Sequence, residues 1–166
     1  MTIEEAIQTA IQYENEVRDV YTSAVEKVSD PTGRRVCQVL ANEEQGHIDY
    51  LEARLAEWRD TGQVKSAELE TVVPSPEAIA EVADQLSTGM GDVDRGTEME
   101  MLTKALAAER KTRGFYREMV AELPLEGQRL FERFVEIEDG HLAMVQAEID
   151  SLTGTGAWFD VLEIRL

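Results

Sequence analysis

The most constraining feature of the sequence is that ionisable residues interrupt its apolar helical stripes. Four stretches carry apolar residues at alternating spacings of three and four, which is typical of helices that pack in a bundle. The stripes are interrupted by four glutamates and by both histidines of the chain: Glu14, Glu44, His47, Glu109, Glu138 and His141. Burying several unpaired carboxylates together is very costly. The pattern therefore predicts a bundle whose interior holds a cation.

Turn and capping residues divide the chain into four long helices. We expect the first from near Thr2 to the Ser29-Asp30-Pro31 turn, and the second from Pro31 to 61. The third should begin near 92–94 and run to Leu123, and the fourth should follow Pro124 and end at Gly154. A long connection over about 61–93 contains a short helix after Ser75-Pro76, with an apolar face formed by Ile79, Val82, Ala83 and Leu86.

These elements predict an all-α fold, a ferritin-like four-helix bundle of two antiparallel helix hairpins joined by a long crossover. The bundle should occupy 1–153, followed by an aromatic tail over 154–166. The two halves also share a pattern. The spacing of Glu14, Arg18 and Tyr21 matches that of Glu109, Arg113 and Tyr116, and Glu44-x2-His47 matches Glu138-x2-His141. We expect an approximate two-fold axis between the halves.

The chemistry of the six interior residues indicates a metal centre. Two divalent ions carry a formal charge that matches four carboxylates, and an oxygen-rich set with two imidazoles and no thiolate suits iron or manganese. One Glu from each of two helices and Glu-x-x-His from each of the other two is the pattern of di-iron and di-manganese bundles. The alternatives are that Arg18 and Arg113 neutralise Glu14 and Glu109 as i,i+4 pairs, and that the histidines are ordinary core residues.

Two tyrosines and one cysteine lie on the same stripes. Tyr21 and Tyr116 either pack in the core or donate a hydrogen bond to a ligand carboxylate, and both roles are compatible. Arg18 and Arg113 either lie next to the ligands or extend into solvent. Cys37 is expected to be a small core residue.

Composition excludes several classes of protein. The 34 acidic residues against 16 basic ones give a net charge of −18, which disfavours nucleic-acid binding and docking to an anionic membrane. No apolar run approaches the roughly 20 residues of a membrane span. A single cysteine and the lack of a visible secretory signal favour a cytoplasmic location.

Over about 140 residues, from Tyr13 through Leu152, the chain resembles the rubrerythrin branch of the ferritin-like superfamily. The resemblance depends on the Glu14, Arg18 and Tyr21 pattern, on Glu44-Gln45-Gly46-His47 and Glu138-Asp139-Gly140-His141, and on Glu109 with Phe115-Tyr116 downstream. It implies a non-haem centre of two iron ions that reduces hydrogen peroxide or dioxygen. We also expect a homodimer or higher homo-oligomer.

Two departures from the family pattern stand out. The chain lacks the four cysteines of the rubredoxin domain, so electrons would come from a separate donor protein or directly from Fe(II). Thr112 stands where rubrerythrins place an additional glutamate, three residues after the third-helix ligand, which puts their redox-linked ligand switching in doubt here.

Two other functions compete with this interpretation. One is a ferroxidase coupled to iron storage. The other is a non-catalytic metal-binding bundle that docks a partner through its tail residues Trp158, Phe159, Val161, Leu162, Ile164 and Leu166. A tail of this kind is more often a clamp over the chain's own bundle. Membrane-bound quinone hydroxylases share the ligand order, but no apolar membrane-binding segment is evident.

Overall fold

The computed structural model describes residues 1–65, 68–83 and 95–160, and every regular element within these ranges is a helix. The helices are α1 (Ile3–Lys27), α2 (Pro31–Thr61), α3 (Pro76–Ala83), α4 (Arg95–Glu122) and α5 (Leu125–Thr155). The expected start of the third helix at 92–94, Leu86 and the last four tail residues named above lie outside the described ranges. The prediction of an all-helical bundle is confirmed.

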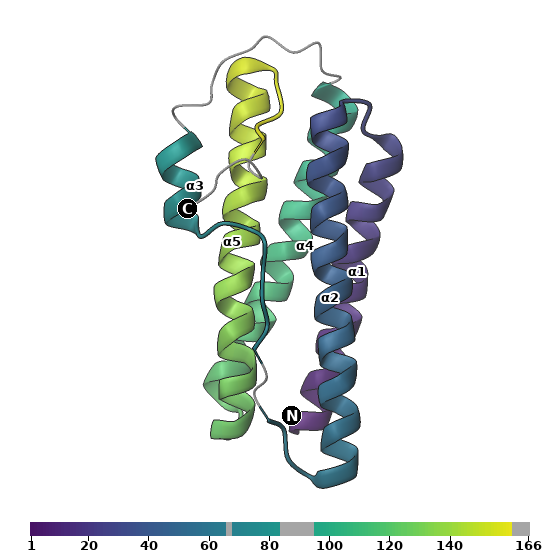
Figure 1. Ribbon diagram of the computed structural model, residues 1–166, viewed down its shortest axis with the longest axis vertical. Helices are drawn as coiled ribbons and strands as arrows, with labels where there is room; N and C mark the ends of the chain where they lie inside the picture. The colour runs from purple at the N-terminus through teal and green to yellow at the C-terminus, as the bar shows by residue number, and fades with distance from the viewer. Residues whose placement is uncertain (66–67, 84–94, 161–166) are drawn as a thin grey trace.

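Of the four long helices, α1 and α5 run in one direction, and α2 and α4 run in the opposite direction (Figure 1). Helix α1 lies beside the antiparallel α2, α4 lies beside the antiparallel α5, and α1 also packs against α4 (Figure 1). The segment that follows α2 returns along α5 to α3, which packs against α5 (Figure 1). The described part of this crossover therefore lies along α5.

Local capping chemistry sets the helix ends. Thr2 and Glu5 form a capping box at the start of α1, and Asp30 caps α2 by accepting from the Gly33 amide. Gly62 ends α2 in the left-handed conformation that favours glycine. The predicted end of the fourth helix at Gly154 is wrong, because α5 continues to Thr155 and Gly156 supplies the left-handed cap.

Two apolar clusters fill the two ends of the bundle. One contains the N-terminal turns of α1 together with the C-terminal half of α4, including Phe115, and the aromatic start of α5, including Phe131 and Phe134. The other contains the C-terminal half of α1, the start of α2 and the later part of α5. On each of the four long helices, the ionisable stripe residues lie between the two apolar clusters. Apolar side chains therefore pack above and below the polar layer.

The described part of the tail packs onto the bundle. The Trp158 indole donates to Glu98 at 2.7 Å, and the Phe159 amide donates to Glu148 at 2.9 Å. Both aromatic rings are buried, and a Cβ on Gly33 would collide with the Trp158 ring. This confirms the clamp interpretation for Trp158 and Phe159. Among the described helices, none is both long and apolar enough to cross a membrane.

Candidate metal centre

The six predicted ligands meet in the middle of the bundle. Their side chains are at most 1% exposed. Each of the four long helices contributes its ligand side chains to the same layer of the bundle. The ligands lie midway along the apolar stripe of the helix, where a core residue would otherwise point inward. The structure therefore brings together all six residues that the sequence singled out.

The predicted ligands form two overlapping groups, each of which could hold a metal ion. One group contains Glu14, Glu44, His47 and Glu138, and the other contains Glu44, Glu109, Glu138 and His141. Within each group the ligand atoms lie within 4.8 Å of one another. Glu44 and Glu138 belong to both groups. Glu14 with His47, and Glu109 with His141, belong to one group each.

Both histidines direct the same ring nitrogen toward the carboxylates. His47 Nδ1 lies 3.0 Å from Glu44 Oε2 and 3.2 Å from Glu14 Oε2. His141 Nδ1 lies 2.8 Å from Glu44 Oε1 and 3.5 Å from Glu109 Oε1. The rings stack with centroids 5.4 Å apart and planes 11° from parallel. This parallel arrangement follows from the repeated Glu-x-x-His pattern on α2 and α5.

Each tyrosine donates to a glutamate of the other half. The Tyr21 hydroxyl on α1 donates to Glu109 Oε1 on α4 at 2.5 Å, and Tyr116 on α4 donates to Glu14 Oε1 on α1. Of the two roles predicted for the tyrosines, the structure shows both, since the rings are also buried in the apolar clusters. Each bond occupies one oxygen of an unshared glutamate. The other oxygen of Glu14 faces His47 Nδ1, and that of Glu109 has no hydrogen-bond partner within the described ranges.

The arginines do not neutralise the ligand carboxylates. Arg18 donates to Asp19 and to Gln45, and Arg113 pairs with Asp139. Gln45 and Asp139 directly follow the shared glutamates, so the arginines tie the two helices of each hairpin together beside the centre. The alternative that they replace a metal as counter-charge to Glu14 and Glu109 is wrong.

Without a metal, protons compensate the buried charge. Burial and the nearby Glu44 charge raise the pKa of Glu14 to about 8. Burial opposes protonation of His47, but Glu14 and Glu44 outweigh it and raise its pKa to about 10. The pKa of Glu138 is raised well above its usual value by burial and by Glu109. The site therefore favours a positive charge among its carboxylates.

Several buried ligand atoms also lack a hydrogen-bond partner within the described part of the chain. They include Glu109 Oε2, both oxygens of Glu138, and His47 Nε2. Buried polar atoms are normally satisfied, so unpaired carboxylate oxygens that converge on one place fit a cation. The structure thus supports buried Glu and His groups that can hold metal ions.

Cys37 takes no part in this set. It is buried in one of the apolar clusters, as predicted, and burial together with Glu148 raises its pKa to about 12. It therefore remains a neutral thiol at physiological pH.

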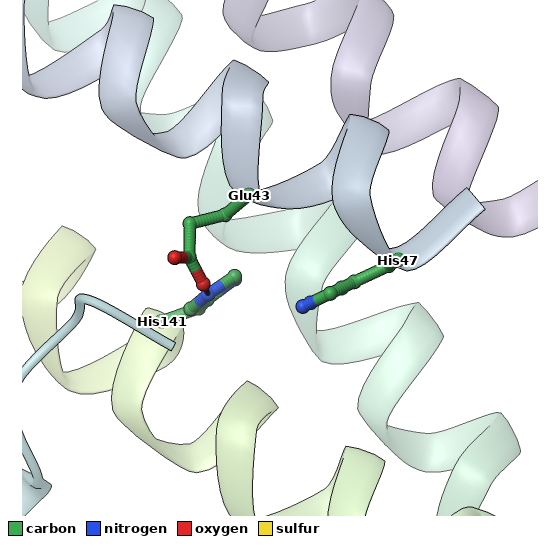
Figure 2. Close-up of side chains that lie close together, drawn as sticks. All are labelled: Glu43, His47 and His141. Carbon is green, nitrogen blue, oxygen red and sulfur yellow. Dashed lines mark hydrogen bonds and ion pairs between the residues drawn. The ribbon is translucent and has the colours of Figure 1, made fainter. Parts of the chain in front are cut away.

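One carboxylate near the centre was not predicted. Glu43 Oε2 lies 3.4 Å from His141 Nε2, and Glu43 forms a further cluster with both histidines (Figure 2). Burial opposes its ionisation, but bonds from His141, the Val72 amide and the Thr71 hydroxyl lower the pKa of Glu43. Its spacing of four from His47 was a sequence signal for a shared helix face. The decisive contacts come from the crossover, whose course the periodicity does not reveal.

Comparison with known proteins gives no assignment: no family model matches the sequence, and neither a curated protein nor a solved structure matches the chain.

Proposed function

We propose that this chain is a rubrerythrin-like protein of the ferritin-like class that reduces hydrogen peroxide or dioxygen at a centre of two iron ions. The ferritin-like arrangement of its two helix hairpins is part of this proposal. The observation that carries it is the pair of overlapping ligand groups that share Glu44 and Glu138. Two divalent ions would neutralise the four buried carboxylates, and Glu44 and Glu138 would be available as ligands to both.

The donor set favours iron or manganese over other metals. Oxygen ligands dominate, both imidazoles use Nδ1, and the described ligand set contains no thiolate. When bound, two iron ions supply two electrons and act as Lewis acids toward an oxygen substrate. Reduction of one hydrogen peroxide to two waters consumes those two electrons and two protons.

The protein's own groups would position the ligands and exclude water. Tyr21 and Tyr116 fix one oxygen of Glu109 and one of Glu14, so the second oxygen of each of these glutamates would bind the metal. The pKa of both tyrosines is raised, first by burial and then by the carboxylates, so each hydroxyl retains its proton and remains a donor. The apolar clusters at the two ends limit bulk water around the centre.

The direct test begins with metal content. Protein purified without chelator should contain about two iron or manganese ions per chain, and the anaerobically reduced iron form should be reoxidised by peroxide or dioxygen. His141→Ala should lower the metal content and abolish the oxidant-driven absorbance change. Catalytic consumption of peroxide with an artificial electron donor would support the oxidoreductase. Unchanged metal content in His141→Ala would contradict the ligand assignment.

Ferroxidase activity coupled to iron storage is the second candidate, and the net charge of −18 favours it because an acidic surface attracts Fe(II). The two functions differ in the fate of added iron. A storage protein would retain many iron atoms per chain after repeated additions of Fe(II) and dioxygen, in assemblies of many subunits. A peroxide or dioxygen reductase would stop near two.

The non-catalytic docking alternative receives no support from the described tail, because Trp158 and Phe159 are buried against the chain's own helices.

A further inference from the structure

The two repeated halves differ at their outer faces. Gly46 and Gly140 each precede a ligand histidine and occupy equivalent positions on α2 and α5. A Cβ on Gly140 would lie 3.2 Å from the Pro74 carbonyl oxygen, whereas a Cβ on Gly46 would meet nothing within 4 Å. Among the described residues, the crossover backbone therefore packs against α5 at Gly140 and leaves the face of α2 at Gly46 open.

The two histidines are also held differently. His141 contacts the carboxylates through Nδ1 and Glu43 through Nε2, so both sides of its ring have a partner. Glu43 is itself fixed by the Thr71 hydroxyl at 2.7 Å and by the Val72 amide at 2.9 Å. His47 Nε2 is buried and has no hydrogen-bond partner within the described ranges.

The sequence explains why His141 has a carboxylate at Nε2 and His47 does not. Ile137 stands on α5 where Glu43 stands on α2, so the second half offers no equivalent carboxylate. The His47 ring is consequently the less constrained of the two ligand rings.

A pocket of about 340 Å³ lies on the open side. Its lining combines residues of α2 with the crossover, and it reaches His47: Val39, Asn42, Glu43, Gly46, His47, Leu69, Glu70 and Val72. Figure 2 shows Glu43 and His47 extending from α2 toward His141. Two carboxylates in the lining attract cations to this pocket.

We propose that divalent metal ions reach the centre through this pocket, where Glu43 binds the arriving ion and the His47 ring swings aside to admit it. The proposal rests on the two-metal centre proposed above. It follows from the pocket's position, from its acidic lining, and from a ligand ring that has open space beside it and no bond on its outer nitrogen. A pocket of similar volume beside Pro74 and Gly140 on the α5 side does not reach His141, whose Nε2 already contacts Glu43.

The test measures how fast metal-free protein takes up Co(II) alone, followed by stopped-flow absorbance, with the final metal content determined after equilibration. Gly46→Leu fills the pocket and should slow uptake at least tenfold, with about two ions per chain still bound at the end. Gly114→Leu is the matched control, because a Cβ at this exposed α4 glycine also meets nothing within 4 Å. Its uptake rate should equal that of the wild type.

Two further variants test the same route independently. Val72→Trp fills the pocket from the crossover and keeps the backbone amide that holds Glu43, so it should also slow uptake if Gly46→Leu does not fold. Glu43→Gln should slow uptake about three- to tenfold at low salt, because the pocket loses a negative charge. Glu52→Gln, an exposed site on the same helix, should not.

Wild-type uptake rates in both pocket-filling variants, or in whichever of them folds, would overturn the route. Wild-type protein that binds no Co(II) at equilibrium would instead contradict the two-metal centre itself. Loss of bound metal in Gly46→Leu at equilibrium would also overturn the proposal, since the substitution would then act on the ligands and not on access.

Discussion

Replacing a shared glutamate and replacing an unshared one should have different effects on the number of bound metal ions. Glu138 belongs to both ligand groups, whereas Glu14 belongs only to the group that contains His47. Glutamine keeps the side-chain volume and removes the charge, and at position 14 its carbonyl still accepts from Tyr116. We expect about one metal ion per chain in Glu14→Gln and almost none in Glu138→Gln.

The size of the effect follows from mass action. At a free metal concentration of 100 times Kd, each bound ion stabilises the folded protein by about 2.7 kcal/mol. For a domain of this length, 1 kcal/mol changes the Tm by roughly 2–4 °C. One ion therefore raises the Tm by about 5–11 °C, and two ions raise it by about twice as much. Glu14→Gln should retain half of the metal-dependent shift, and Glu138→Gln should lose nearly all of it.

The assay combines metal analysis after equilibrium dialysis with thermal unfolding of each variant, measured with and without metal. Comparing each variant with its own metal-free form removes the effect of the substitution on the metal-free fold. Glu109→Gln and Glu44→Gln provide the matched pair from the other helices, and they should reproduce the same one-ion and no-ion results. Two ions in Glu138→Gln, or none in Glu14→Gln, would refute the assignment of shared and unshared ligands.

Four other outcomes follow from the site. In the metal-free protein the raised pKa values of Glu14 (about 8) and His47 (about 10) mean that folding takes up protons. The Tm of this form should therefore fall as pH rises from 5 to 9. Glu14 contributes to this fall between pH 4.5 and about pH 8, and His47 between pH 6.5 and about pH 10. A rising Tm would contradict the buried cluster. Tyr21→Phe removes the donor to Glu109 and should weaken one of two metal-binding phases about 10–100-fold by calorimetry, and two unchanged phases would exclude this role. With one cysteine in the chain, the iron-loaded protein should show no rubredoxin-type absorption and only slow reduction by a nicotinamide cofactor; rapid turnover would reveal a donor site in the chain. Because the Thr112 hydroxyl donates to its own helix backbone at 3.0 Å, it adds no ligand, and stopped flow should give similar rates with dioxygen and peroxide; a peroxide preference of several orders of magnitude would contradict this.

The helices and the six ligands could be predicted because their signals are local. Capping residues such as Asp30 and turn residues such as Gly62 determine helix ends within a few positions. A glutamate on an apolar stripe points into the bundle whatever the bundle's exact geometry, so the interior position of Glu109 needed no tertiary information. The predicted end of α5 was wrong because Gly154 and Gly156 are equally plausible helix ends in the sequence. Only the left-handed backbone conformation at Gly156 distinguishes them.

The partners of the tyrosines could not be predicted in the same way. Tyr21 lies on the stripe of Glu14, but its hydroxyl reaches Glu109 on the neighbouring α4. Which helix a long side chain reaches depends on the rotation and spacing of two helices, which periodicity within one helix does not determine. Glu43 illustrates the same limit, because its neighbours on the crossover are 28 and 29 residues away in sequence.

The crossover carries none of the six predicted ligands, yet it is the element that makes the surroundings of the two ligand groups unequal. The repeated halves give each group one unshared glutamate, one histidine and one tyrosine bond. Thr71 and Val72 fix Glu43 against His141, and the Pro74 carbonyl lies beside Gly140. In the other half Ile137 stands at the position equivalent to Glu43, and a Cβ on Gly46 would meet nothing within 4 Å. A hydrogen bond from a ligand histidine to a carboxylate orients the ring and strengthens it as a ligand. The His141 position should therefore be the tighter of the two, and the His47 position the one through which metal ions exchange.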